Sequence, residues 1–210
     1  MNDIIVLSKR DTHPEGYISI DTTSRNTNEK LKKGLSPFYL GPVQCYDDLI
    51  ARNVENAWQY SKLYEIHLDE TGYPNQDYFK WRDTGFNKTF ADRYPMGKGK
   101  IPKYTFWKND SGNQYLGYIE ARKQIYIPLY AKAVVKTPAY AYLESLRDNN
   151  EDIALVDFDG YNYLAMGLTL KDVINSENKK MGHAFVLAML LQGELKVENN
   201  KLIDVNHLLE

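Results

Sequence analysis

The sequence has 210 residues, 43% hydrophobic and 26% charged, which are ordinary values for a soluble globular protein and fit one domain. A formal net charge of −2 argues against a protein that coats nucleic acid through bulk electrostatics. The single cysteine, Cys45, excludes an intramolecular disulfide and a cysteine-built metal site, and the four histidines show no paired metal-ligand spacing. No apolar run is long enough for a signal peptide or a membrane helix, so we expect a cytoplasmic protein.

The first fifth of the chain predicts short elements. Residues 4–7 and 17–20 read as two short strands separated by a Pro/Gly turn. The polar run over residues 22–33 predicts a loop or a short irregular helix. Residues 36–43 contain two prolines, and a residue before proline is disfavoured from helical angles, so we expect an extended segment there.

Residues 52–62 predict a helix with a row of polar side chains. Glu55, Gln59 and Lys62 stand at i, i+4 and i+7, so they share one helix face. Trp58 falls on an adjacent stripe that can pack inward. An acid, an amide and an amine in one row on a half-buried helix can line a pocket. The alternative is that Glu55 and Lys62 are solvated surface charges.

A glycine- and lysine-rich loop follows at residues 93–103. Its centre, Gly97-Lys98-Gly99-Lys100, is flexible and cationic, so backbone N–H and ammonium groups there can close on a phosphate. It lacks the glycine spacing and the Ser/Thr of a P-loop, and a solvent-exposed basic loop is the alternative. A short helix is expected over residues 78–82, and a hairpin over residues 104–117.

Two helices are predicted between residues 119 and 147. Residues 119–135 form the longest candidate, and Pro128 inside it should kink or split it. Thr137 and Pro138 have the residue types of an N-cap and a first helical position, and they predict a helix that ends near residue 147.

An apolar strand over residues 152–158 is predicted next. The loop over residues 157–163 then holds two carboxylates, Asp157 and Asp159, between aromatic rings that include Tyr161. A short helix after Thr169 follows this loop.

Residues 179–191 are apolar nearly all round and predict a central core helix. Lys180 and Gly182 stand at its start, where free N–H groups and the helix dipole attract phosphate. The alternative for Gly182 and His183 is close helix packing and a capping imidazole. A C-terminal hairpin is predicted over residues 194–205.

Taken together, these stretches resemble the NADAR (YbiA-like) N-glycosidase superfamily. That family has a Ser-x-Phe entry, a Trp-Pro-Ile/Val step, a turn with Asp and a helix carrying Glu-x-x-x-Gln-x-x-Lys. The same order occurs here in Ser36, Phe38, Gly41-Pro42-Val43, Asp47, Glu55, Gln59 and Lys62. Residues 118–132 are similar to the middle helix of the family, and residues 181–191 to its closing glycine-containing loop and apolar helix.

The resemblance covers most of residues 36–191 and has three departures. Gly41 stands where the family has tryptophan. Residues 159–162, Asp-Gly-Tyr-Asn, are the counterpart of an Asp-x-x-Trp-Gly loop. Residues 67–117 include a long stretch without a counterpart, so the substrate pocket is expected to differ from that of relatives.

The resemblance implies an α+β, mainly α fold: a single helical domain, residues 1–210, of the YbiA/NADAR-like type with small peripheral strands and hairpins. Residues 36–191 would form its core, with N-terminal strands and a loop over residues 1–35 and a C-terminal hairpin over residues 192–210. The helices that contain Glu55, Ile119 and Met181 would meet in the centre.

The resemblance also implies an N-glycosidase that hydrolyses a ribose–nitrogen bond in a nucleotide-like or ADP-ribosylated substrate. An oxocarbenium-like transition state needs negative charge near C1, a proton for the departing nitrogen and an activated water. Glu55 would be the general acid/base and Asp159 the second carboxylate, with Asp157 as the alternative. Substrate contacts are expected from Phe38, Trp58, Gln59, Lys62, Lys98, Lys100, Tyr161, Lys180 and Gly182.

This scheme requires no metal and no cofactor. The expected partner is a small-molecule nucleotide or an ADP-ribosylated nucleobase, with nucleic acid only as a modified substrate and with no membrane. One alternative is a non-catalytic ADP-ribose- or nucleotide-binding module of the same fold. Another is a structural protein in which the polar row merely stabilises the core.

Overall fold

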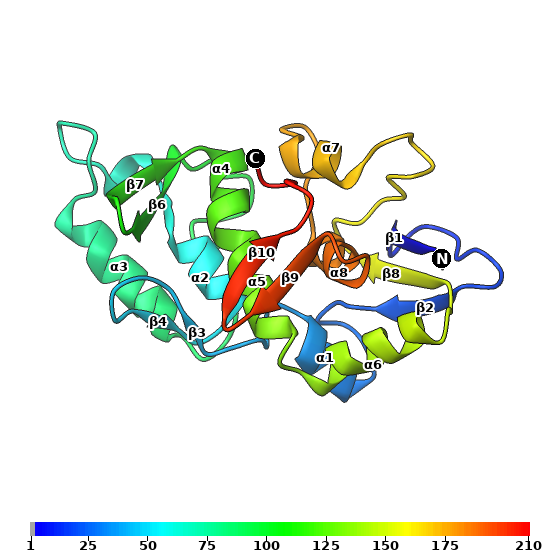
Figure 1. The fold of residues 1–210 in the computed structure, drawn as a ribbon. Coiled ribbons are helices and arrows are strands. Elements are labelled where there is room, and N and C mark those ends of the chain that lie inside the picture. Colours follow the sequence, from blue (N-terminus) through cyan, green and yellow to red (C-terminus); the bar gives the residue numbers. More distant parts are fainter. Residues whose placement is uncertain (1–2) are drawn as a thin grey trace.

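The computed structural model describes residues 3–210, and a three-stranded parallel sheet forms one end of the molecule. β1 (Ile4–Ser8) and β2 (Ile18–Asp21) lie on either side of β8 (Ile153–Asp157), as Figure 1 shows. Ile4 and Ile18 both pair with Ile153. Every residue of β8 is buried, which is usual for the central strand of a parallel sheet.

The three strands are confirmed, but their sheet is part of the core and does not lie at the periphery, where the sequence predicts it to lie. β8 lies between β1 and β2, so both faces of the sheet carry apolar side chains. Val6 and Leu155 belong to the main core, whereas Ile5 and Val156 form a smaller cluster on the opposite face. The sheet is therefore part of the core, and the carboxyl ends of its strands meet at one edge.

The central helix of this half is α8 (His183–Leu191), which contacts β1 and β8. All nine of its residues are buried, which confirms the predicted core helix. The helix begins at His183 rather than at residue 179, because Gly182 has extended backbone angles and serves as the N-cap. Lys180 therefore precedes the helix rather than lying in its first turn.

Three further helices surround the sheet and α8. α6 (Pro138–Asp148) packs against α8 and α1 (Glu29–Leu35), and Thr137 caps α6 as predicted. The polar run over residues 22–33 ends in a regular helix, α1. α7 (Leu170–Asn175) begins at a capping box in which Thr169 is the N-cap, also as predicted.

The predicted long helix is continuous through Pro128. It consists of α4 (Tyr118–Ala121), the π-helical segment η2 (Arg122–Tyr126) and α5 (Ile127–Val134). Proline lacks an N–H and crowds the carbonyl four residues earlier, here that of Gln124. In a π turn each N–H reaches the carbonyl five residues back, and this wider turn just before Pro128 lets the helix continue without a break.

Helix α2 (Val54–Tyr60) carries the polar row, and all seven of its residues are buried. The Asn53 side chain caps it by accepting a hydrogen bond from the Asn56 N–H. The helix is shorter than predicted at its C-terminus, because the chain turns at Ser61 and enters strand β5 (Lys62–Leu63). Lys62 consequently lies outside the helix.

The segment before α2 is a turn followed by a short hairpin, not a uniformly extended strand. The N–H groups of Tyr39 and Leu40 both donate to the Ser36 carbonyl. β3 (Val43–Gln44) then pairs with β4 (Ile50–Ala51).

Gly41 in this segment lies tightly against the backbone of Arg52 and Asn53. A Cβ at this position would lie well inside van der Waals contact with the Arg52 carbonyl group. The chain path therefore excludes the tryptophan that the resemblance would place there.

The other end of the molecule is built from an antiparallel sheet and one long helix. β6 (Tyr104–Asn109) pairs with β5 and with β7 (Gly112–Leu116), which confirms the predicted hairpin. α3 (Gln76–Asn87) contacts α2 and β4 and is longer than the predicted helix. A short 3₁₀ helix, η1 (Glu65–His67), precedes α3.

The chain ends in the predicted hairpin, β9 (Leu195–Glu198) and β10 (Lys201–Asp204). Asn199 and Asn200 form its turn with φ angles of 49° and 61°, a region that asparagine tolerates better than most residues. The hairpin packs against α5 and α8.

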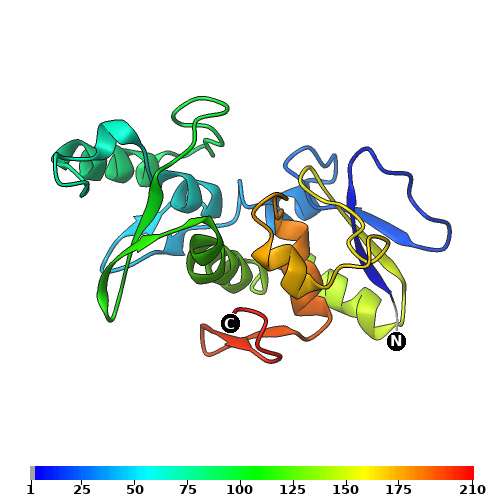
Figure 2. The ribbon, with the colours of Figure 1, turned by 90° about the horizontal axis from the view of Figure 1, so that it is seen from above.

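The protein is thus an α+β protein, as predicted, with about a third of its residues in helices. Figure 2 shows the parallel sheet and its helices on one side, the antiparallel sheet with α3 on the other, and α2 with the α4–α5 run between them. Among residues 3–210, no helix combines the length and the apolar character that crossing a membrane requires.

Candidate functional site

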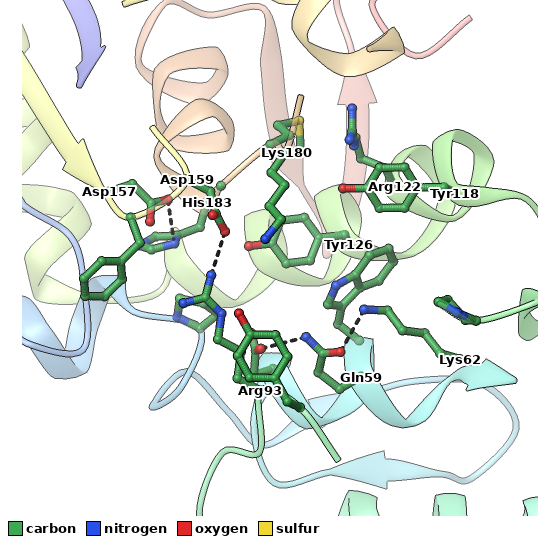
Figure 3. Close-up of a pocket in the computed structure, with 18 of the residues that line it drawn as sticks. Gln59, Lys62, Arg93, Tyr118, Arg122, Tyr126, Asp157, Asp159, Lys180 and His183 are labelled. Carbon is green, nitrogen blue, oxygen red and sulfur yellow. Dashed lines mark hydrogen bonds and ion pairs between the residues drawn. The ribbon is translucent and has the colours of Figure 1, made fainter. Parts of the chain in front are cut away.

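A cavity of about 510 Å³ lies between α2 and the carboxyl edge of the parallel sheet (Figure 3). Its walls come from α2, the glycine-rich loop, the α4–η2 run, the loop after β8 and the segment before α8. Both signs of charge line it. The basic residues are Lys62, Arg93, Lys100, Arg122, Lys179 and Lys180, and the acidic residues are Glu55, Asp157, Asp159 and Glu177.

The polar row predicted on α2 faces this cavity. The Gln59 Nε2 donates to Glu55 Oε1 at 2.9 Å, and Lys62 Nζ donates to Gln59 Oε1 at 2.8 Å. The predicted polar row is therefore present, although Lys62 joins it from β5 and not from the face of the helix. The alternative of solvated surface charges is wrong for Glu55, which is buried, and Lys62 is partly buried.

Burial changes the acid–base properties of this row. Glu55 is only 6% exposed, and burial raises its pKa, opposed by the Gln59 hydrogen bond and then by the charges of Lys62, Arg93 and His183. Burial also lowers the pKa of Lys62 to about 8, with the charge of Glu55 opposing the change. The row thus holds a carboxyl group that keeps its proton more readily than usual.

Asp157 forms a buried ion pair with His183. Asp157 Oδ2 lies 3.0 Å from His183 Nδ1, and His183 Nε2 lies 2.9 Å from the Thr22 carbonyl oxygen. Both ring nitrogens therefore face acceptors, and both need a proton to make these hydrogen bonds. In its protonated form His183 bridges the end of β8 and the chain after β2.

The pKa values of the pair move apart for this reason. Burial alone would lower the pKa of His183, but the Asp157 charge and the two hydrogen bonds outweigh it and raise that pKa. Burial alone would raise the pKa of Asp157, but the charge of His183 and its hydrogen bond lower it, helped by the Ala184 N–H.

This pair is expected to impose a pH dependence on stability. The depressed pKa of Asp157 contributes stability above its ordinary value of 3.8, which is lost as the pH falls through the folded-state pKa. The raised pKa of His183 contributes stability below its ordinary value of 6.5, which is lost as the pH rises through the folded-state pKa. Urea unfolding across pH 4 to 9 should therefore show a decline above pH 6.5 that is smaller in Asp157→Asn.

The matched control for that measurement is Asp159→Asn, which removes a carboxylate two residues away. The free energy of unfolding of Asp159→Asn should decline above pH 6.5 as it does in the wild type, because this substitution leaves Asp157, the partner of His183, in place. An unchanged slope in Asp157→Asn would contradict the charged pair.

Gly182 makes the close approach of Asp157 possible. A Cβ on Gly182 would overlap Asp157 Oδ2, while the same carboxylate accepts a hydrogen bond from the Ala184 N–H at 3.2 Å. The N-terminus of α8 is thus already capped by a carboxylate of the protein itself. This arrangement corrects the predicted phosphate site there. It matches the alternative of close packing at Gly182, but the capping group is the Asp157 carboxylate and not the His183 imidazole.

Asp159 lies in the cavity wall and is paired with Arg93. Arg93 Nη2 lies 2.8 Å from Asp159 Oδ2, and the two side chains are 32% and 28% exposed. Figure 3 shows this pair pointing across the cavity from opposite walls. Phe158, between the two aspartates, has Lys9 and Arg25 within 5.5 Å of its ring centroid.

Seven of the nine predicted substrate contacts line the cavity: Phe38, Trp58, Gln59, Lys62, Lys100, Lys180 and Gly182. Lys98 is exposed and does not line it, because it lies in the second of two successive turns of the glycine-rich loop. Tyr161 does not line it either. Its ring packs on Phe185 of α8, with ring centroids 4.8 Å apart, so it faces the core.

The structure adds residues that the sequence prediction missed, foremost Arg122. This buried guanidinium donates to the carbonyl oxygens of Val173, Ile174 and Ser176 at 2.9, 2.7 and 3.1 Å. It satisfies the free carbonyls at the end of α7 and so fixes the chain that leads to Lys180.

Tyr118 and Tyr126 were also missed. Together with Arg122 they stand at i, i+4 and i+8 of one helical run, a spacing that gives only a weak signal because an α-helix would spread these positions around its axis. Arg93 and His183 carry no comparable local signal, because their partners are distant in the sequence.

Among residues 3–210, no group of three or more His, Cys, Asp or Glu side chains is arranged to hold a metal ion. The fold and the cavity define an α+β protein with a deep, mixed-charge pocket at the carboxyl edge of a small parallel sheet. Residues 7–165 match the family of unknown function DUF6939, and the chain belongs to that family. No curated protein and no solved structure matches the chain.

Proposed function

We propose that this protein is an N-glycosidase that hydrolyses a ribose–nitrogen bond in a nucleotide-like or ADP-ribosylated substrate. The observation that carries the proposal is Glu55, a buried carboxyl group that faces a cavity of about 510 Å³ and is oriented by Gln59. Its raised pKa suits a group that protonates the departing nitrogen and then accepts a proton from the attacking water.

Asp159 is the better placed of the two aspartates to stabilise the positive sugar. The charge of Asp157 is engaged by the buried His183 and by the first turn of α8. Asp159 is partly exposed in the cavity wall, and Arg93 holds it from the opposite side. A carboxylate in this position offsets positive charge that develops at C1.

The rest of the cavity suits the remainder of a nucleotide. Lys62, Lys100 and Lys180 supply positive charge for phosphate groups, and Trp58 and Tyr118 offer aromatic surfaces for a base or a sugar. The size and the mixed charge of the cavity support a small-molecule nucleotide or an ADP-ribosylated nucleobase as the substrate. We place this activity in the cytoplasm.

We propose further that the fold is of the YbiA/NADAR-like type. The entry segment that carries the resemblance packs directly on the Glu55 helix, where the Glu55 N–H donates to the Pro37 carbonyl at 3.0 Å. Ser36 and Phe38 line the same cavity as Glu55. Ser36, Phe38, Glu55, Gln59 and Lys62 thus line one cavity, whereas Asp47 lies away from it and pairs with Lys108.

The alternative function is a binding module that holds ADP-ribose or a nucleotide without turnover. The observation that favours it is that Asp157 and Asp159 are both engaged in ion pairs within the protein. A ligand could then be held by the cationic and aromatic walls while Glu55 remains chemically idle.

The test is incubation of the protein with ADP-ribosylated nucleobases and with N-ribosides, followed by mass spectrometry of released base and sugar. Release by the wild type but not by Glu55→Gln is the expected result. Absence of release, combined with a ligand-induced rise in melting temperature, would favour the binding module. Absence of both would leave the polar row with a purely structural role.

A further inference from the structure

Tyr126 presents an unpartnered hydroxyl group to the cavity. Its side chain is 7% exposed, its ring lies 5.3 Å from that of Trp58, and it lines the cavity wall. Within residues 3–210 the hydroxyl makes no hydrogen bond to the protein, whereas the buried Tyr130 on the same helical run donates to the Leu35 carbonyl at 2.7 Å. This hydroxyl is open to the cavity, so a ligand that displaces water from it loses affinity unless the ligand offers a replacement hydrogen bond.

The π-helical segment is what aims Tyr126 at the cavity. Tyr126 is the last residue of η2, and the wide turn keeps it in line with Tyr118 and Arg122, which line the same cavity. In an ordinary α-helix, positions i, i+4 and i+8 drift steadily around the axis. Figure 3 shows the Tyr126 ring projecting from this run toward the side of the cavity where Asp159 and Arg93 meet.

The surroundings make this hydroxyl a hydrogen-bond donor. Burial raises the pKa of Tyr126 well above its ordinary value, and the charges of Glu55, Asp157 and Asp159 raise it further. The phenol is therefore a neutral hydrogen-bond donor near neutral pH. A partner in the cavity must offer an acceptor, and a partner that can also donate to a neighbouring carboxylate fits best.

We propose that Tyr126 donates a hydrogen bond to the 2-hydroxyl of a ribose in this cavity, and that this contact makes the site select ribose over 2-deoxyribose. The inference rests on the proposed function for the placement of the sugar. If Glu55 and Asp159 act at C1, the nearest sugar hydroxyl is the one on C2. A sugar hydroxyl can accept from the phenol and donate to a carboxylate at the same time.

A 2-deoxy sugar would leave the phenol unsatisfied, and a site built around a hydroxyl rejects the analogue that lacks it. Calorimetric titration with two probe pairs measures this selection: ADP-ribose against 2′-deoxy-ADP-ribose, and ribose 5-phosphate against 2-deoxyribose 5-phosphate. We expect the wild type to bind the ribose member of each pair about ten- to hundredfold more tightly. In Tyr126→Phe this ratio should fall to near one, through loss of affinity for the ribose member.

Tyr130→Phe is the matched control, because it removes a buried hydroxyl from the same helical run but outside the cavity. It should lower the melting temperature, through loss of the Leu35 hydrogen bond, and keep the wild-type affinity ratio. An equal affinity for both members in the wild type, or an unchanged ratio in Tyr126→Phe, would overturn the inference.

The same experiment separates this inference from the proposed function. Ribose-selective binding that depends on Tyr126, without release of base from any N-riboside, supports the inference and overturns the N-glycosidase proposal. Release of base, combined with an affinity ratio that Tyr126→Phe does not change, supports the N-glycosidase proposal and overturns the inference. If the wild type binds none of the four probes, both the inference and the proposed function are overturned.

Discussion

Glu55→Gln is expected to reduce the release of base by about a thousandfold or more, while the protein still folds and binds ligand. Glutamine has nearly the same shape as glutamate and can neither donate an acidic proton nor accept one from water. General acid–base catalysis contributes roughly 10²–10⁴ in rate, and Glu55 is proposed to serve both half-reactions. The measurement is single-turnover release of base followed by mass spectrometry.

The fold should tolerate this change, because the new amide oxygen can accept the Gln59 hydrogen bond that Glu55 Oε1 accepts at present. Removing a buried acid also removes its desolvation cost, so the melting temperature should stay constant or rise. Glu70→Gln, at an exposed loop position, is the matched control and should retain full activity. Equal release by wild type and Glu55→Gln would remove Glu55 from the mechanism.

Among the proposed substitutions, Asp157→Ala is expected to lower the free energy of unfolding the most, by roughly 3–5 kcal/mol at pH 6. The substitution leaves the buried His183 without its counter-charge and the Ala184 N–H without its acceptor. Urea unfolding monitored by circular dichroism provides the free energy of unfolding. Asp159→Ala is the control, and it should cost less than about 1 kcal/mol because its ion pair is partly exposed.

Gly182→Ala should destabilise the protein through the same contact, because the added methyl group overlaps the Asp157 carboxylate. A double-mutant cycle tests this origin directly. In the Asp157→Ala background, Gly182→Ala should cost far less than in the wild type, since the obstructing carboxylate is gone. Fully additive effects would show that Gly182 is required for another reason.

The parts of the site that were predictable from the sequence are those set by local spacing. Glu55 and Gln59 are one helical turn apart, so their contact follows from helix geometry alone. The Arg93–Asp159 and Asp157–His183 pairs join residues that are distant in the chain, and no local pattern encodes them.

The fold shows the same division between local and tertiary causes. Hairpin turns and helix caps, such as Asn199-Asn200 and Thr137, were predictable because a few neighbouring residues determine them. The early end of α2 at Tyr60 was not, because pairing of Lys62 with Thr105 in β6 draws the chain out of the helix. The insertion of β8 between β1 and β2 depends likewise on contacts along most of the chain.

The position of β8 determines when the parallel sheet can form during synthesis. Ile4 and Ile18 have no partner until Ile153 has left the ribosome, which at roughly 5–20 residues per second takes on the order of ten seconds. Pairing at such sequence separation also slows folding, because the intervening loop must close first. Asp157 ends the same late strand, so the cavity acquires its carboxylate wall only when the sheet closes. The cavity is thus incomplete in the nascent chain until folding is almost finished.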